Sequence, residues 1–112
     1  MKIYHNTRCR KSREGVQYLT DKKINFEIFD YLKEGVSEDD IKSILKKLNM
    51  SAIELVRKNE KIWKDNFKGK ELKEEQIISI LCEEPKLIER PIIVHKNKAV
   101  IGRPKENIDN LL

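Results

Sequence analysis

The chain has 112 residues, of which 38% are charged and 38% are hydrophobic, so its length suits one globular domain with a single core. Lysine and arginine outnumber aspartate and glutamate by 24 to 19, and the formal net charge is +5. Acidic and basic residues are interspersed, which argues against a nucleic-acid-binding stripe. With no signal peptide, no apolar run of membrane-spanning length and only two cysteines, we expect a cytoplasmic protein without a membrane or nucleic-acid partner.

The first thirty residues predict a β-α-β unit. Residues 2–4 form a short apolar strand, and from Arg10 onward the spacing of Val16 and Leu19 is helical. Apolar and polar residues then alternate over residues 24–29, which predicts a second strand.

The middle of the chain predicts helices. Ser37 and Asp40 form a capping-box pattern at the start of the first one. Its apolar stripe consists of Ile41, Ile44, Leu45 and Leu48. Ser51 and Glu54 repeat the capping pattern and predict a short helix that ends near residues 58–59, which places Arg57 at its C-terminal end. Residues 60–72 are predicted to be a partly helical connection.

The last third predicts one more helix, a hairpin and a final helix. The helix begins near Lys73 and ends at Pro85. Pro91 precedes an apolar strand over residues 92–94, and a tight turn leads to a second strand over residues 99–101. Pro104 suits the first position of the final helix. The residues of that helix expected to face inward are Ile108, Leu111 and Leu112. The whole order predicts an α/β fold with several helices over residues 37–84, and the strands alone would allow more than one kind of α/β sandwich.

Cys9 lies where the first strand runs into the first helix. The first N–H groups of a helix have no internal partners, and the helix dipole adds positive charge, so both favour a thiolate. Four cations surround it: Arg8, Arg10, Lys11 and Arg13. We therefore predict an exposed, nucleophilic thiol with a pKa below the usual value of about 8.5. The alternative, a buried small hydrophobe, is disfavoured because burying the neighbouring charges is costly.

Two other kinds of site can be weighed against this one. A phosphatase loop needs the spacing Cys-x5-Arg, but the sixth residue after Cys9 is Gly15. A zinc site from His5, Cys9, Cys82 and His95 would lack the paired ligand spacing of structural zinc sites, so we expect no metal. Cys82, near the end of a predicted helix, is expected to be structural.

The segment His5-x3-Cys9-x3-Arg13 resembles the active-site signature of the arsenate reductase (ArsC) family of thioredoxin-like proteins. Residues 55–59, 89–94 and 101–104 resemble the three later family segments, each of which supplies an arginine to an oxyanion site. In order and spacing the resemblance covers essentially the whole chain. It implies a thioredoxin-like fold, β-α-β followed by β-β-α, in a single domain over residues 1–112 with the helical insertion between the two halves.

The resemblance also implies the site. Cys9 is the expected nucleophile, and Arg57, Arg90 and Arg103 are the expected cations, because a planar guanidinium bonds two oxygens of an oxyanion at once. In thioredoxin-like folds the proline that corresponds to Pro91 is cis and faces the reactive cysteine. Taken alone, each arginine would be interpreted as a solvated surface residue.

His5, Ser12 and Arg13 complete the predicted site. His5 could lower the thiol pKa or relay a proton, or it could only orient the loop through a backbone hydrogen bond, and the sequence leaves these roles open. Ser12 stands three residues after Cys9, where a dithiol motif has its second cysteine, and its hydroxyl could hydrogen-bond the thiolate. The oxidised cysteine must then be resolved from outside, and the resemblance implies glutathione as co-substrate and a glutaredoxin as partner, with no bound cofactor.

Three functions remain open at this stage. The first is a monomeric arsenate reductase with one catalytic cysteine. The second is a glutaredoxin-like thiol-disulfide reductase that is not specific for arsenate. The third is an Spx-type regulator that binds RNA polymerase. Redox-switch regulators of that type carry Cys-x-x-Cys and lack the arginine of residues 101–104, so Ser12 and Arg103 argue against the third function.

Overall fold

The computed structural model describes all residues, Met1–Leu112, and the chain forms two compact units. One unit comprises Met1–Glu34 together with Arg90–Leu112, and the other is Gly35–Glu89. The predicted insertion over residues 37–84 lies inside the second unit, while the assignment of the whole chain to a single domain stays a prediction. No helix has the length and hydrophobicity needed to cross a bilayer.

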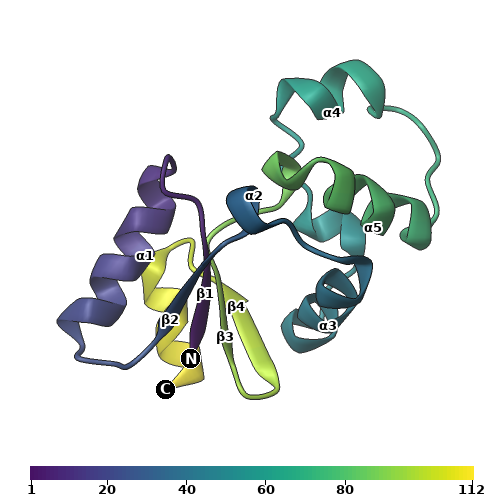
Figure 1. Cartoon of the computed structure of the whole chain (residues 1–112). Helices are drawn as coiled ribbons and strands as arrows, with labels where there is room; N and C mark the ends of the chain where they lie inside the picture. The colour runs from purple at the N-terminus through teal and green to yellow at the C-terminus, as the bar shows by residue number, and fades with distance from the viewer. The chain divides into compact units, whose positions relative to one another are not determined.

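The first unit is built on a four-stranded sheet with the order β2-β1-β3-β4 (Figure 1). Its strands are β1 (Lys2–His5), β2 (Glu27–Asp30), β3 (Ile92–His95) and β4 (Lys98–Ile101). Strand β1 pairs in parallel with β2 through the crossover helix α1 (Arg10–Asp21), and antiparallel with β3, the first strand of the hairpin. The predicted α/β order of β-α-β followed by a hairpin and a helix is confirmed. The last helix, η3 (Lys105–Leu111), is a 3₁₀-helix.

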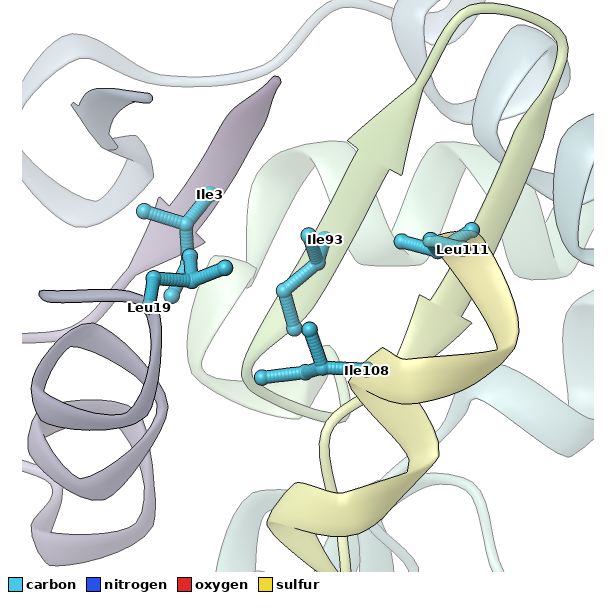
Figure 2. Close-up of a cluster of buried hydrophobic side chains, with 5 residues drawn as sticks. All are labelled: Ile3, Leu19, Ile93, Ile108 and Leu111. Carbon is cyan, nitrogen blue, oxygen red and sulfur yellow. The ribbon is translucent and has the colours of Figure 1, made fainter. Parts of the chain in front are cut away.

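The core of the first unit lies between one face of this sheet and the helices α1 and η3. Its buried members are Ile3, Leu19, Ile93, Ile108 and Leu111 (Figure 2). Ile3 and Ile93 are register partners on neighbouring strands, so their side chains share a face. The prediction that Leu112 faces inward is wrong, since its side chain is 62% exposed. With three residues per turn, a 3₁₀-helix aligns Ile108 with Leu111 and turns the next residue away.

Two predicted boundaries in this unit differ from the structure. Strand β2 begins three residues later than predicted, because Lys23 has the left-handed conformation, with φ of 60°, and the N–H of Ile24 donates back to the carbonyl of Leu19 at 3.2 Å. Ile24 thus belongs to the end of α1. Pro104 precedes η3 and is not its first residue. The short helix α2 (Tyr31–Glu34) follows β2 directly.

The second unit is helical. It contains α3 (Glu38–Leu48), η1 (Ala52–Leu55), α4 (Lys61–Asn66), α5 (Glu74–Glu83) and η2 (Pro85–Leu87). The predicted capping box of α3 is confirmed: Ser37 Oγ accepts the N–H of Asp40 at 3.1 Å, and the Asp40 carboxylate accepts the N–H of Ser37 at 3.2 Å.

The second capping pattern does not open an α-helix. Ser51 makes no side-chain cap: the N–H of Glu54, which such a cap would bind, donates to the Ser51 carbonyl at 3.1 Å. The N–H of Ala52 donates to the carboxylate of Glu74, at 2.5 and 3.0 Å. The predicted helix to residues 58–59 is therefore wrong, and only the 3₁₀ turn η1 forms. Beyond it the backbone is extended, and the N–H of Arg57 donates to the carbonyl of Leu87 at 2.6 Å. Arg57 thus lies in an extended segment and not at a helix C-terminus.

Replacing Ser37 by Ala is expected to lower the free energy of unfolding by about 1 kcal/mol, because the first turn of α3 loses its side-chain acceptor. Ser51→Ala is the matched control, since it makes the same chemical change at a serine that caps nothing, and its effect should stay within about 0.5 kcal/mol. Urea denaturation of both variants measures the difference. Equal losses would contradict the assignment of the cap.

Candidate active site

Cys9 is the N-cap residue of α1, at the end of the loop that leaves β1. Its carbonyl accepts the N–H of Arg13 at 3.1 Å, which begins the helix. The loop before it is a tight turn, closed by the N–H of Cys9 donating to the carbonyl of Asn6 at 2.9 Å. The side-chain oxygen of Asn6 also accepts the N–H of Arg8 at 3.0 Å. Sequence reasoning missed Asn6, although an asparagine that bonds the backbone two residues on is a recognised turn signal.

The prediction that Cys9 is exposed is wrong, since only 8% of the residue is accessible. The four cations beside it had argued against burial, but all four are exposed: Arg8, Arg10, Lys11 and Arg13. Long basic side chains can keep their charged ends in water while the backbone beside them is covered. Charged neighbours in sequence therefore do not prevent a residue from being buried.

The pKa of Cys9 is lowered to about 6. Burial raises it, but the side-chain hydrogen bond and charge of Arg90, together with the backbone N–H groups of Ser12 and Lys11, outweigh that effect. The Cys9 side chain does not cap α1 with a well-formed hydrogen bond. The N–H groups of the first turn therefore act on the sulfur as nearby dipoles. The predicted low pKa of the thiol is confirmed. The positive charge that lowers it comes from Arg90, far along the chain, and not from the exposed cations beside Cys9.

Arg90 and Arg103 flank the hairpin and both reach the sulfur. Nη2 of Arg103 lies 3.7 Å from Cys9 Sγ, and its Nε donates to the carbonyl of Arg90 at 2.8 Å. The two residues come together because Ile92 and Ile101 are register partners at the open end of the hairpin. The peptide bond between Arg90 and Pro91 is cis, as predicted from the resemblance. The bond between Arg103 and Pro104 is also cis, which was not predicted.

His5 and Ser12 are buried beside this loop with unused hydrogen-bonding atoms. His5 is the last residue of β1, and its Nδ1 has no hydrogen-bond partner. Burial lowers the pKa of His5, although the negative charge of Asp30 raises it in part. Ser12 is fully buried, and its hydroxyl also has no partner. Ser12 therefore acts on the Cys9 sulfur through its backbone N–H and not through the hydroxyl that the sequence singled out.

Arg13 lies in the first turn of α1 and bonds the loop from outside. Its Nη1 donates to the carbonyl of Thr7 at 2.9 Å. The bond ties the middle of the turn before Cys9 to the helix after it. In this structure Arg13 holds the shape of the loop.

Arg57 belongs to the second unit, where two carboxylates surround it. Its Nε lies 3.5 Å from Glu89 Oε1, and its Nη1 lies 4.0 Å from Glu60 Oε1. The Nη1 atom is buried and donates no hydrogen bond. A guanidinium with an unused donor retains capacity to bind an anion.

Cys82 lies half-buried on α5 in the opposite electrostatic environment. Burial raises its pKa, and the carboxylates of Glu38, Asp40 and Glu83 raise it further. A thiol of raised pKa is a poor nucleophile at neutral pH, which agrees with a structural cysteine. No three His, Cys, Asp or Glu side chains lie together in a geometry suited to a metal ion.

Comparison with known proteins connects this site to one family. A family model described as the ArsC family matches residues 4–111. The chain is 36% identical to an arsenate reductase of Haemophilus influenzae, over 98% of this chain and 97% of that protein. It is 42% identical to an uncharacterized protein of Escherichia coli K12, YfgD, over 96% and 92%. The structure of an arsenate reductase from Vibrio cholerae is similar with a TM-score of 0.94 at 33% identity, covering 100% of this chain and 98% of that one. The predicted thioredoxin-like fold is confirmed.

The lowered pKa of Cys9 predicts a pH-dependent contribution to stability. Because the folded pKa of about 6 lies below that of the unfolded chain, the thiolate stabilises the fold fully above the unfolded value and loses this effect as the pH falls through about 6. We expect the difference in unfolding free energy between the parent protein and Cys9→Ser to grow from pH 5 to pH 9. Both proteins should carry Cys82→Ser, so that only one thiol titrates. A difference that does not change with pH would contradict the lowered pKa.

Proposed function

The chain belongs to the ArsC family, and from this membership we propose that it is an arsenate reductase with Cys9 as its nucleophile. The observation that carries the proposal is the approach of Arg90 and Arg103 to the sulfur. Two guanidinium groups beside an acidic thiol suit a reaction in which a thiolate attacks the centre of a charged oxyanion. A reaction between two anions needs such cations, because they offset the repulsion between attacker and substrate.

The proposed chemistry has two steps. The Cys9 thiolate attacks arsenic(V), an S–As bond forms, and one As–O bond breaks to release its oxygen as water after protonation. A second thiol, glutathione, then attacks the Cys9 sulfur, and the electron pair of the S–As bond stays on arsenic, which leaves as arsenic(III). The enzyme is left as a mixed disulfide between Cys9 and glutathione. A glutaredoxin reduces that disulfide and restores the thiol.

The external reductant follows from the residue at position 12. A second cysteine there could resolve the mixed disulfide inside the protein, but the position holds Ser12, and the raised pKa of Cys82 makes it a poor nucleophile. We therefore assign resolution of the mixed disulfide to glutathione and a glutaredoxin. We further propose that the protein acts in the cytoplasm as a monomer, with no bound cofactor. The same serine, together with Arg103, disfavours the redox-switch regulator that binds RNA polymerase.

We assign the arsenate oxygens to Arg57, Arg90 and Arg103. Support for Arg90 and Arg103 comes from their contacts with the sulfur. Support for Arg57 comes from the resemblance of residues 55–59 to a family segment and from its unused Nη1 donor. The chain can in this way supply three guanidinium groups, which hold their charge at every physiological pH.

His5, Ser12 and Arg13 have supporting roles in the proposal. The lowered pKa of His5 keeps its ring neutral near pH 7, so it can relay a proton to the departing oxygen. The unpartnered Ser12 hydroxyl is available to an oxygen of the substrate. Arg13 keeps the loop in shape through its bond to Thr7.

Replacing Arg90 or Arg103 by Ala is expected to weaken arsenate binding by about 1.5–3 kcal/mol, which is the range for a charge-assisted hydrogen bond. Lysine variants should fall between wild type and Ala, because a point charge lacks the two-oxygen geometry. Arg57→Ala is expected to behave in the same way. Arsenate kinetics should be measured beside turnover of a glutathionylated peptide, which presents no tetrahedral anion. Small and equal effects on both substrates would favour the general thiol-disulfide reductase.

Cys9→Ser is expected to abolish turnover of arsenate and of the glutathionylated peptide, because the nucleophile is lost. Cys82→Ser is the matched control and should leave both rates within about twofold of wild type. Circular dichroism checks that each variant is folded. A folded but inactive Cys82→Ser protein would replace the external reductant with an intramolecular disulfide.

A further inference from the structure

Gly15 lies in the interior of α1, where glycine costs about 1 kcal/mol compared with alanine. The residue is buried, and a Cβ atom added to it would lie 3.0 Å from Pro91 Cγ and 3.3 Å from Ile3 Cδ1. Both distances are shorter than ordinary van der Waals contact. The missing side chain therefore lets the helix rest directly on the ring of Pro91.

The Pro91 ring is also packed closely against Gly102. It is fully buried, and a Cβ atom added to Gly102 would lie 3.1 Å from the same Cγ atom. The carbonyl of Pro91 also accepts the N–H of Gly102 at 2.8 Å. A side chain at position 15 would therefore push α1 and Pro91 apart by a few tenths of an ångström.

The C-terminal half of α1 packs against η3. Leu19 is fully buried in the core with Ile108. Tyr18 Oη donates to Asp109 at 2.8 Å, and Lys22 Nζ lies 3.1 Å from the same carboxylate. These contacts attach the second half of α1 to η3. A helix pushed outward at position 15 would therefore move chiefly at its N-terminal end, where Cys9 lies.

We propose that Gly15 is a positioning residue that sets the distance between the Cys9 sulfur and the guanidinium groups of Arg90 and Arg103. Arg90 directly precedes Pro91. The contact between α1 and Pro91 therefore sets the position of Cys9 relative to Arg90. The 3.7 Å contact from Arg103 to the sulfur lies toward the long end of the range for a hydrogen bond to sulfur. A displacement of a few tenths of an ångström would weaken it.

Gly15→Ala tests the proposal in a Cys82→Ser background. Alkylation of Cys9 by the neutral reagent iodoacetamide, followed against pH, is expected to show a midpoint raised toward that of an ordinary thiol. Protection of Cys9 by added arsenate should weaken by roughly threefold to tenfold, because a small misplacement of reacting groups is costly. Gln17→Ala is the control, since Gln17 lies on the exposed side of the same helix, and both measurements should match the parent protein. An unchanged midpoint in Gly15→Ala would overturn the proposal.

A second comparison separates positioning from a general structural effect. In an Arg90→Ala background, Gly15→Ala should shift the midpoint less than in the parent protein, because part of its effect passes through Arg90, whose hydrogen bond and charge lower the pKa of Cys9. An equal shift in both backgrounds would refute the positioning role. If Gly15→Ala does not fold, adding Ile3→Val removes the Cδ1 atom 3.3 Å from the new methyl group and keeps the contact with Pro91. The double variant then takes the place of Gly15→Ala in both comparisons.

The arsenate arm of this test rests on the proposed function, but the alkylation arm does not. A raised midpoint in a protein that never reduces arsenate would support the role of Gly15 and defeat the proposed function. An unchanged midpoint in Gly15→Ala, in a protein that does reduce arsenate, would overturn the role of Gly15 and support the proposed function.

Discussion

The candidate active site depends on one interaction, the stabilisation of the Cys9 thiolate by Arg90 at the N-terminus of α1. Burial opposes a charge on this sulfur, and an uncompensated buried charge would protonate or destabilise the fold. The sheet order solves this problem. Strand β1 delivers the loop with Cys9, and β3 lies next to β1, so the hairpin brings Arg90 and Arg103 to the same end of the sheet.

The same charges that make the thiol acidic suit it to an oxyanion. An arginine that binds a thiolate keeps further N–H donors. Arg103 donates one hydrogen bond to the carbonyl of Arg90 and another to the Cys9 sulfur. An arriving anion and the thiolate therefore share these cations. The close packing of Gly15 and Gly102 against Pro91 keeps nucleophile and cations at a fixed separation.

The sequence allowed prediction wherever the controlling contact is local. The capping box at Ser37 needs only the residue three positions on, and the loop around Cys9 is one continuous motif. Prediction failed where a distant residue decided the outcome. The carboxylate of Glu74 binds the N–H of Ala52 where the sequence predicted a longer helix, and Cys9 owes its acidity to an arginine 81 positions away. The burial of Cys9 likewise follows from packing that no neighbouring residue reveals. The distant arginines were predicted from the family resemblance, because sequence spacing alone does not show which arginines lie near Cys9.

The most direct test of this account is a competition between the thiolate and an inert oxyanion for the same cations. The alkylation midpoint of Cys9 should be measured with increasing sulfate, with chloride at matched ionic strength as the control. We predict that sulfate raises the midpoint in a saturable way, that chloride does not, and that Arg103→Ala reduces the effect, because an anion bound beside the sulfur opposes its charge. A midpoint that responds equally to sulfate and chloride would contradict a shared site for nucleophile and oxyanion.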